Sequence, residues 1–152
     1  MNKKSAKRIL LFFVLSVCLV LFLLWIDLVR DTGDRNVNGI YVSESLIIVA
    51  QEQNVDYCKL LNKAIEGNDD AIKQLALLKI YDGAGYDHSA VIVDLIKLIG
   101  ENKFIYSLTS INNEKKKWIK KDIEAGLEYS NNPELQTLTF KEAFPKIYEF
   151  LN

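Results

Sequence analysis

The hydrophobic positions divide the chain into one unbroken apolar run near the N-terminus and a periodic pattern that fills the rest. Residues 9–26 read ILLFFVLSVCLVLFLLWI, which contains no charge and a single hydroxyl, that of Ser16. At ~1.5 Å per residue, a helix over this run is ~27 Å long, close to the ~30 Å hydrocarbon core of a bilayer. With Leu28 and Val29 as an extension, the pattern predicts a transmembrane helix over residues 9–29.

The charges that flank this run predict its orientation. Residues 1–8 carry four positive charges and no acid, whereas Asp31 and Asp34 follow the run. The positive-inside rule then places the N-terminus in the cytoplasm and the C-terminal part across the inner (cytoplasmic) membrane. A cleaved signal peptide is disfavoured because the run is long and no small-x-small triplet follows it closely. Lipidation at Cys18 is disfavoured because Val17, rather than a small residue, precedes it. We therefore expect a single-pass signal anchor.

Between the anchor and the periodic region, residues 30–42 are expected to form a polar tether. Residues 31–39, DTGDRNVNG, are rich in turn-forming residues. The stretch from Ile40 to Gln51 is ambiguous, since it has β-branched clusters but also a Ser43-Glu44 pair typical of a helix start. Helix is the preferred interpretation because no partner strand is visible elsewhere.

Helical periodicity then repeats through residues 43–152, which we expect to form one extracytoplasmic domain. Asn68 is typical of a helix cap, Asp87 is expected to cap a later helix, and Thr139 with Glu142 matches a capping box. Gly83 and Gly85 are expected to end a helix. The predicted helices cover residues 55–66, 69–81, 87–99, 102–108 and 113–129, with a last one that ends at residue 151 and begins or kinks at Pro145.

These helices predict an all-α fold, a compact bundle of five or six short helices behind one transmembrane helix. Short connections between successive helices favour antiparallel neighbours. The periodicity resembles that of HEAT-like helical hairpins, although no second copy with matching residues is present.

Composition and charge narrow the class of protein. The net charge of −1 conceals an uneven distribution, because residues 31–152 hold fourteen basic and nineteen acidic side chains, a net charge of −5. An acidic domain disfavours nucleic acid as a partner. The 49% apolar content and two prolines exclude a wholly disordered chain, and two cysteines exclude a disulfide scaffold. No P-loop, GxGxxG, HExxH, CxxC or serine elbow occurs, so we expect no cofactor, no metal and no catalytic residue.

One segment still gathers chemically active side chains. Residues 81–90, YDGAGYDHSA, contain the only histidine, His88, with Asp82 and Asp87 beside two glycines. These side chains could bind a metal or perform acid–base chemistry, with Cys58 as a further ligand or a nucleophile. The structural alternative is a helix end and a new helix cap, with Cys58 a buried free thiol. Because Tyr81 and Tyr86 flank the segment, we interpret it as a candidate partner-binding edge.

A second candidate surface is basic. Residues 114–122, EKKKWIKKD, place Lys117, Lys120 and Lys121 on one arc of a helix, opposite Ile119, Ile123 and Gly126. This arc is either a solvated face over a core tryptophan or a contact for anionic headgroups or a partner's acidic patch.

All seven tyrosines lie beyond the predicted anchor, and tyrosine is enriched at protein interfaces. These features favour a membrane-anchored, non-catalytic protein-binding domain of a bacterial envelope, facing the periplasm or exterior. Its most concrete form is an immunity-type inhibitor of an envelope-acting toxin, because acidic inhibitors commonly meet basic enzymes. The alternatives are an accessory or scaffold subunit of an envelope complex, and a small enzyme or metal-binding domain that uses Asp82, Asp87 and His88.

Overall fold

The computed structural model describes residues 16–20 and 33–152, and the chain divides into two units, Met1–Thr32 and Gly33–Asn152. Residues 16–20 are helical and exposed. The rest of the predicted anchor 9–29 lies outside the described residues, as does the basic segment 1–8. Within the described ranges, none of the helices combines the length and the apolar character needed to cross a bilayer. The anchor therefore stays a prediction from the sequence.

The second unit begins with a β-hairpin, where we expected a tether followed by a helix. Strands β1 (Arg35–Val37) and β2 (Ile40–Val42) pair antiparallel, with Val37 opposite Ile40. Asn38 and Gly39 form the two-residue connection with φ of 51° and 93°. A turn with positive φ at both positions favours Asn-Gly and matches the twist of paired strands. Residues 35–42 are therefore part of the folded domain, because Ile40 and Val42 are buried in its core.

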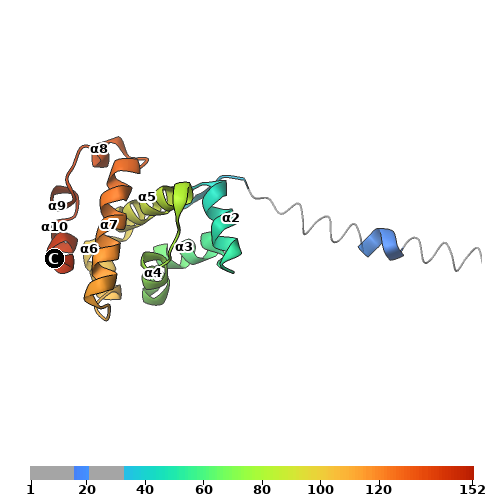
Figure 1. Ribbon diagram of the computed structural model, residues 1–152, viewed down its shortest axis with the longest axis horizontal. Coiled ribbons are helices and arrows are strands. Elements are labelled where there is room, and N and C mark those ends of the chain that lie inside the picture. Colours follow the sequence, from blue (N-terminus) through green and yellow to red (C-terminus); the bar gives the residue numbers. More distant parts are fainter. Residues whose placement is uncertain (1–15, 21–32) are drawn as a thin grey trace, which may run out of the picture. The chain divides into compact units, whose positions relative to one another are not determined.

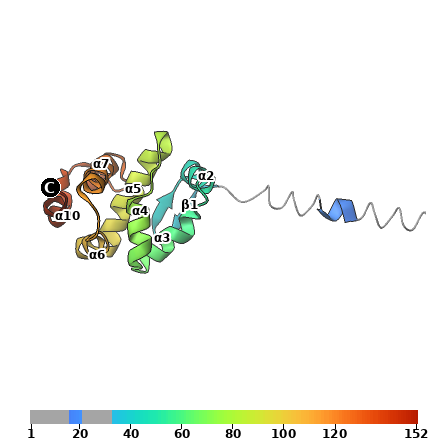
Figure 2. The ribbon, with the colours of Figure 1, turned by 60° about the horizontal axis from the view of Figure 1, so that its bottom comes forward.

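The remainder of this unit is helical, which confirms the all-α interpretation apart from the hairpin, but its described residues form nine helices rather than the five or six expected. The helices are α2 (Glu44–Glu52), α3 (Tyr57–Ile65), α4 (Asp69–Ala76), α5 (Asp82–Ile99), α6 (Glu101–Ser107), α7 (Asn113–Tyr129), α8 (Pro133–Gln136), α9 (Phe140–Ala143) and α10 (Pro145–Leu151). Helix α5 lies in the middle of the unit, with α2 and α3 on one side and α7 and α10 on the other (Figures 1 and 2).

Side-chain caps fix several helix starts that the sequence indicates. Ser43, Asn68 and Asn112 each accept a hydrogen bond from a backbone N–H in the first turn of the helix that follows. Thr139 and Glu142 form the predicted capping box at α9. These contacts satisfy N–H groups that have no partner within the helix, so the local sequence is enough to specify where these helices begin.

The end of α4 and the start of α5 differ from the predictions. Helix α4 ends at Ala76 rather than continuing to residue 81, and α5 already begins at Asp82, so Gly83 and Gly85 lie inside a helix. The last predicted helix is confirmed as α10, which begins at Pro145 and ends at Leu151, and the capping box belongs to the separate short helix α9. Proline lacks the N–H that a continuous helix needs. The N–H of Ile147 donates to the Glu101 carboxylate at 2.9 Å, which holds the start of α10 against α6.

Helices α5 and α7 pack closely against each other in the core. A Cβ atom added at Gly126 would lie 2.1 Å from the backbone oxygen of Ser89 and 2.7 Å from a methyl group of Val93. Only glycine fits at this crossing, because any side chain would collide with the backbone of α5. The large side chains that are fully buried come from most elements of the unit: Leu46, Tyr57, Leu61, Ile72, Leu75, Ile92, Leu95, Ile96, Phe104, Leu108, Ile119 and Ile123.

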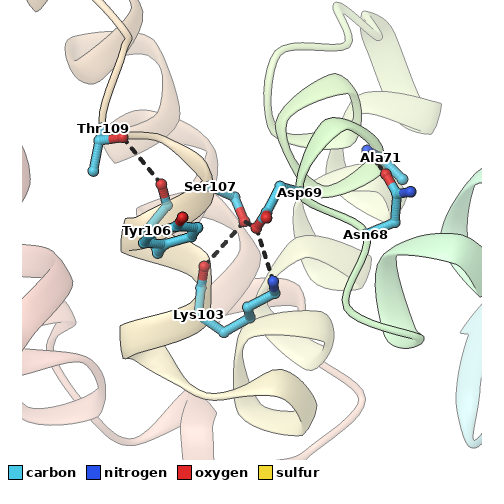
Figure 3. Close-up of polar contacts among 7 residues, drawn as sticks. All are labelled: Asn68, Asp69, Ala71, Lys103, Tyr106, Ser107 and Thr109. Carbon is cyan, nitrogen blue, oxygen red and sulfur yellow. Dashed lines mark hydrogen bonds and ion pairs between the residues drawn. The ribbon is translucent and has the colours of Figure 1, made fainter.

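A polar cluster joins α4 to α6 (Figure 3). The Asp69 carboxylate accepts hydrogen bonds from Lys103 Nζ at 2.8 Å and from Ser107 Oγ at 2.6 Å. The bonds from Lys103 and Ser107 lower the pKa of Asp69. Asp69 also lies in the first turn of α4, where a negative charge is favourable. The cluster is half-exposed and fully paired, so we interpret it as a structural link.

Candidate functional site

The candidate segment 81–90 is the start of α5 rather than a loop. Tyr81 is the residue before the helix, and Asp82 has a left-handed φ of 57°. Aspartate tolerates this conformation better than most residues. A Cβ atom at Gly85 would lie 3.0 Å from the backbone oxygen of Ile80, so the glycine allows the incoming chain to pass close to the helix. The glycines thus shape a tight helix entry rather than a helix end.

His88 points into the core and away from the other candidate residues. Its side chain is 2% exposed, and its Nδ1 lies 2.7 Å from the hydroxyl of Tyr57. Burial lowers the pKa of His88 to about 4, against a smaller opposing effect of the Leu75 backbone oxygen. At neutral pH the ring is therefore uncharged, and its Nδ1 shares one hydrogen bond with the Tyr57 hydroxyl. Burial is therefore the main cause of the low basicity of His88.

Asp87 is not the helix cap that we expected. Its carboxylate accepts hydrogen bonds from the hydroxyls of Ser43, at 2.5 Å, and Ser45, at 3.0 Å, both at the start of α2. Asp87 therefore joins α5 to α2. Together with the burial of His88, this arrangement separates the three side chains that were considered for metal binding or acid–base chemistry. Among the described residues, no group of three or more His, Cys, Asp or Glu side chains is placed to hold a metal ion.

The three lysines of the candidate basic arc have different surroundings. Lys120 Nζ donates to Asn152 Oδ1 at 2.6 Å and lies 5.6 Å from the ring centroid of Tyr148. Lys117 is exposed to solvent. Lys121 instead lines a pocket at the start of α5. The arc is thus not one uniform basic face, and its last member belongs to the first candidate site.

This pocket brings together residues that are about forty positions apart in the sequence. Its volume is about 470 Å³. Its walls come from the entry to α5 and from the middle of α7: Ile80, Tyr81, Asp82, Gly85, Tyr86, Trp118, Lys121 and Asp122. The predicted partner-binding residues Tyr81, Asp82 and Tyr86 therefore share one site with Lys121, whereas Asp87 and His88 face other parts of the domain.

Aromatic rings give the pocket a broad rim. The rings of Tyr81 and Trp118 meet edge to face, with centroids 6.3 Å apart. Tyr86 lies against Tyr129 of α7 with centroids 4.5 Å apart. The three tyrosines keep large exposed fractions of 62%, 49% and 48% for Tyr81, Tyr86 and Tyr129. We call Tyr81, Tyr86, Trp118 and Tyr129 the aromatic rim.

The pocket also contains a partly buried carboxyl group, that of Asp122. Burial raises the pKa of Asp122 to about 6, and the Trp118 side chain opposes this rise. The indole N–H of Trp118 is buried and makes no well-aligned hydrogen bond to any described residue. Nor does Asp122 form an ion pair with a lysine or arginine among the described residues. The site therefore holds a carboxylate whose charge the domain itself does not neutralise.

Sequence reasoning did not single out Trp118, Asp122 and Tyr129 as site residues. Their spacing on α7 carries a partial signal, because Trp118 and Asp122 are four positions apart and share a helix face. Nothing in the local sequence indicates that this face meets the entry to α5. Cys58, the other reactive side chain considered, is a partly buried free thiol, and burial raises its pKa.

A second hollow of about 660 Å³ lies between the hairpin turn and the second half of α5. Its walls include Asp94, Lys97 and Leu98 but no aromatic side chain. Burial also raises the pKa of Asp94, against the opposing hydrogen bond from Ser130.

Comparison with protein-family models, curated proteins and solved structures found no match to the chain.

Proposed function

We propose that this protein is a membrane-anchored, non-catalytic binding protein whose helical domain contacts a protein partner outside the cytoplasmic membrane. In its most concrete form, the protein is an immunity-type inhibitor of a toxin that acts in the bacterial envelope. The observation that carries the proposal is the aromatic rim, in which Tyr81, Tyr86 and Trp118 line one pocket and Tyr129 packs against Tyr86, while the three tyrosines stay exposed.

The rim has the composition of a protein-binding surface. Tyrosine and tryptophan supply large, rigid contact areas at a low cost in conformational entropy, and they dominate the energetics of many interfaces. Tyr86 lies on α5, Trp118 and Tyr129 lie on α7, and Tyr81 directly precedes α5, so two packed helices hold the rim. A rigid base of this kind lowers the ordering cost of binding.

Charge and sequence support the location and the type of partner. The apolar run over residues 9–26 and the basic residues before it favour an anchor with the domain on the far side of the membrane. Residues 31–152 carry a net charge of −5. An acidic domain attracts a basic partner over distances of about a Debye length, ~8 Å at physiological salt.

The first test is capture of the partner by the full-length chain, from envelope and secreted fractions of the source cells, followed by a toxicity assay of the captured protein. Replacing Tyr81 and Tyr86 together by Ala should abolish capture and protection. The matched control is Tyr106→Ala, because Tyr106 is 67% exposed and lies on α6, outside the rim. Equal loss of protection in both variants, or none in either, would contradict a role for the rim.

A second test separates an inhibitor from a scaffold subunit. Residues 1–32 are exchanged for an unrelated single-pass anchor of the same orientation. An immunity-type inhibitor should keep its protective effect, because only residues 33–152 need to reach the toxin. A scaffold whose own membrane helix packs against partners should lose its function, and this result would overturn the inhibitor proposal.

A further inference from the structure

We propose that the pocket between α5 and α7 receives the guanidinium group of an arginine side chain from the protein partner. Asp122 and Asp82 supply the countercharge, and the rings of Tyr81, Tyr86 and Trp118 supply the stacking surfaces. The inference rests on the proposed function only in taking the arginine from a partner protein; the chemistry of the pocket is argued from its own residues.

The carboxylates are the first part of the argument. Asp82 and Asp122 both line the pocket, and neither forms an ion pair with any side chain that the structure describes. Asp122 is partly withdrawn from water, and a partly buried carboxylate that lacks an ion-pair partner is unfavourable. A cation that enters the pocket removes this penalty, and a guanidinium group can donate two hydrogen bonds to one carboxylate.

The aromatic lining is the second part. The planar guanidinium group stacks on aromatic faces and is more weakly hydrated than an ammonium group. The pocket already shows that one of its rings attracts cations, because the ammonium group of Lys79 lies 4.4 Å from the ring centroid of Trp118. Tyr81, directly before α5, and Tyr86, on α5, leave further ring surface exposed for an incoming side chain.

The two nearby lysines do not reverse the charge preference. Lys79 and Lys121 are exposed, and their long side chains can turn into water when another cation enters. Asp82 and Asp122 have short side chains, at the first residue of α5 and in the middle of α7, and Asp122 is partly buried. The carboxylates of Asp82 and Asp122 therefore stay in the pocket when the lysine side chains turn outward. The remaining negative charge favours binding of a cation over an anion.

The size of the site fits a single side chain and its surroundings. A volume of about 470 Å³ lies within the range of ~300–1,000 Å³ that is usual for small-ligand sites. Arginine is also one of the residues that most often contribute the central contact of an interface, together with tyrosine and tryptophan. The hollow near Asp94 has a comparable carboxylate but no aromatic wall, so it serves as an internal comparison.

The test measures binding of N-acetyl-argininamide to the full-length chain in detergent micelles. The chain carries Trp25→Phe, so that Trp118 is the only tryptophan and its fluorescence reports on the pocket. N-acetyl-citrullinamide, a neutral analogue of the same shape, is the control ligand. We expect saturable binding of the arginine compound, with an affinity at least about fivefold higher than that of the citrulline compound, since one charged contact contributes ~1 kcal/mol.

Three variants then test the assignment of charges. Asp122→Asn should weaken arginine binding by at least about fivefold, whereas Lys121→Gln should strengthen it, because a repelling charge is removed. Asp94→Asn is the matched control, a partly buried carboxyl group outside the pocket, and should leave the affinity unchanged. Circular dichroism of each variant confirms that the helices are retained.

Several outcomes would overturn the inference. Equal affinity for the arginine and citrulline compounds, or an Asp122→Asn variant that binds as tightly as the parent chain, shows that charge recognition is absent. If Lys121→Gln weakens binding and N-acetyl-glutamate binds instead, the pocket prefers anions. If a captured partner binds Asp122→Asn at full strength, the arginine pocket fails while the proposed function stands. If arginine binds but no partner is captured, the proposed function fails while the chemistry of the pocket stands.

Discussion

Replacing Gly126 by Ala tests the close contact between α5 and α7 on which the pocket depends. The added methyl group would lie 2.1 Å from the backbone oxygen of Ser89, whereas ordinary carbon–oxygen contacts are ~3.3 Å or longer. The two helices must therefore move apart locally by about 1 Å. Ser89 contributes backbone rather than a side chain to this contact, so rotation of a side chain cannot relieve the collision.

The magnitude follows from two opposing effects. Overpacking of a core costs ~1–3 kcal/mol, and a collision with backbone falls at the upper end of that range. The replacement of glycine by alanine inside a helix also stabilises the folded state by about 1 kcal/mol, because alanine has the higher helix propensity. The net loss in the free energy of unfolding is about 2 kcal/mol, which lowers the Tm by roughly 8 °C in a domain of this size.

The assay is thermal and urea unfolding of residues 33–152, with circular dichroism as the measure of helix content. Gly83→Ala is the matched control, because Gly83 is also in a helix but a Cβ atom there meets nothing within 4 Å. This control should be as stable as the parent chain or gain up to about 1 kcal/mol. If Gly126→Ala unfolds at the same temperature as Gly83→Ala, α5 and α7 do not pack as described.

Further predictions concern titration and helix capping. Because burial lowers the pKa of His88 to about 4, the unfolded chain binds a proton there before the folded one does. The free energy of unfolding should thus fall by ~1.4 kcal/mol per pH unit from about pH 6.5 toward pH 4, and His88→Gln should flatten this slope in urea titrations. For Asp122, burial raises the pKa to about 6, so its ionisation destabilises the fold as the pH rises. Asp122→Asn should gain ~1–2 kcal/mol in urea unfolding at pH 8, after allowance for partial exposure, and little at pH 4; an equal gain at both values would contradict this cause. Thr139→Ala removes the capping box of α9 and should cost ~1 kcal/mol, measured by the Tm.

Helix existence and several helix starts could be predicted from the sequence because their causes are local. Asn68, Asn112 and Thr139 each bond to a backbone N–H three residues later, so the signal is contained within four positions. The β-hairpin also has a local signal, the pair Asn38-Gly39. It was missed because β1 consists of three mostly exposed residues, which carry no hydrophobic alternation.

The start of α5 could not be predicted in the same way. Gly83 and Gly85 are normally signals of a helix end, and here they lie in the first turn. Gly85 is needed because the backbone oxygen of Ile80 passes close to it. Ile80 is in turn held by its burial in the core, which depends on residues from other elements. The local sequence signal of the glycines favours a helix end, but the tertiary contact between Gly85 and Ile80 allows a helix start here.

The apolar N-terminal run, the helical character of the rest and the number of tyrosines could be read from the amino-acid sequence, because these depend on composition and on spacing along one helix. The fold was needed to show which tyrosines are exposed, that His88 is buried against Tyr57, that Asp87 joins two helices, and that Asp82 shares a pocket with Trp118 and Asp122. Each of these relations depends on the packing of separate elements, and the side chains concerned are about thirty to forty-five residues apart. Periodicity and capping describe neighbours within a few positions, so they contain no information about which helix faces meet.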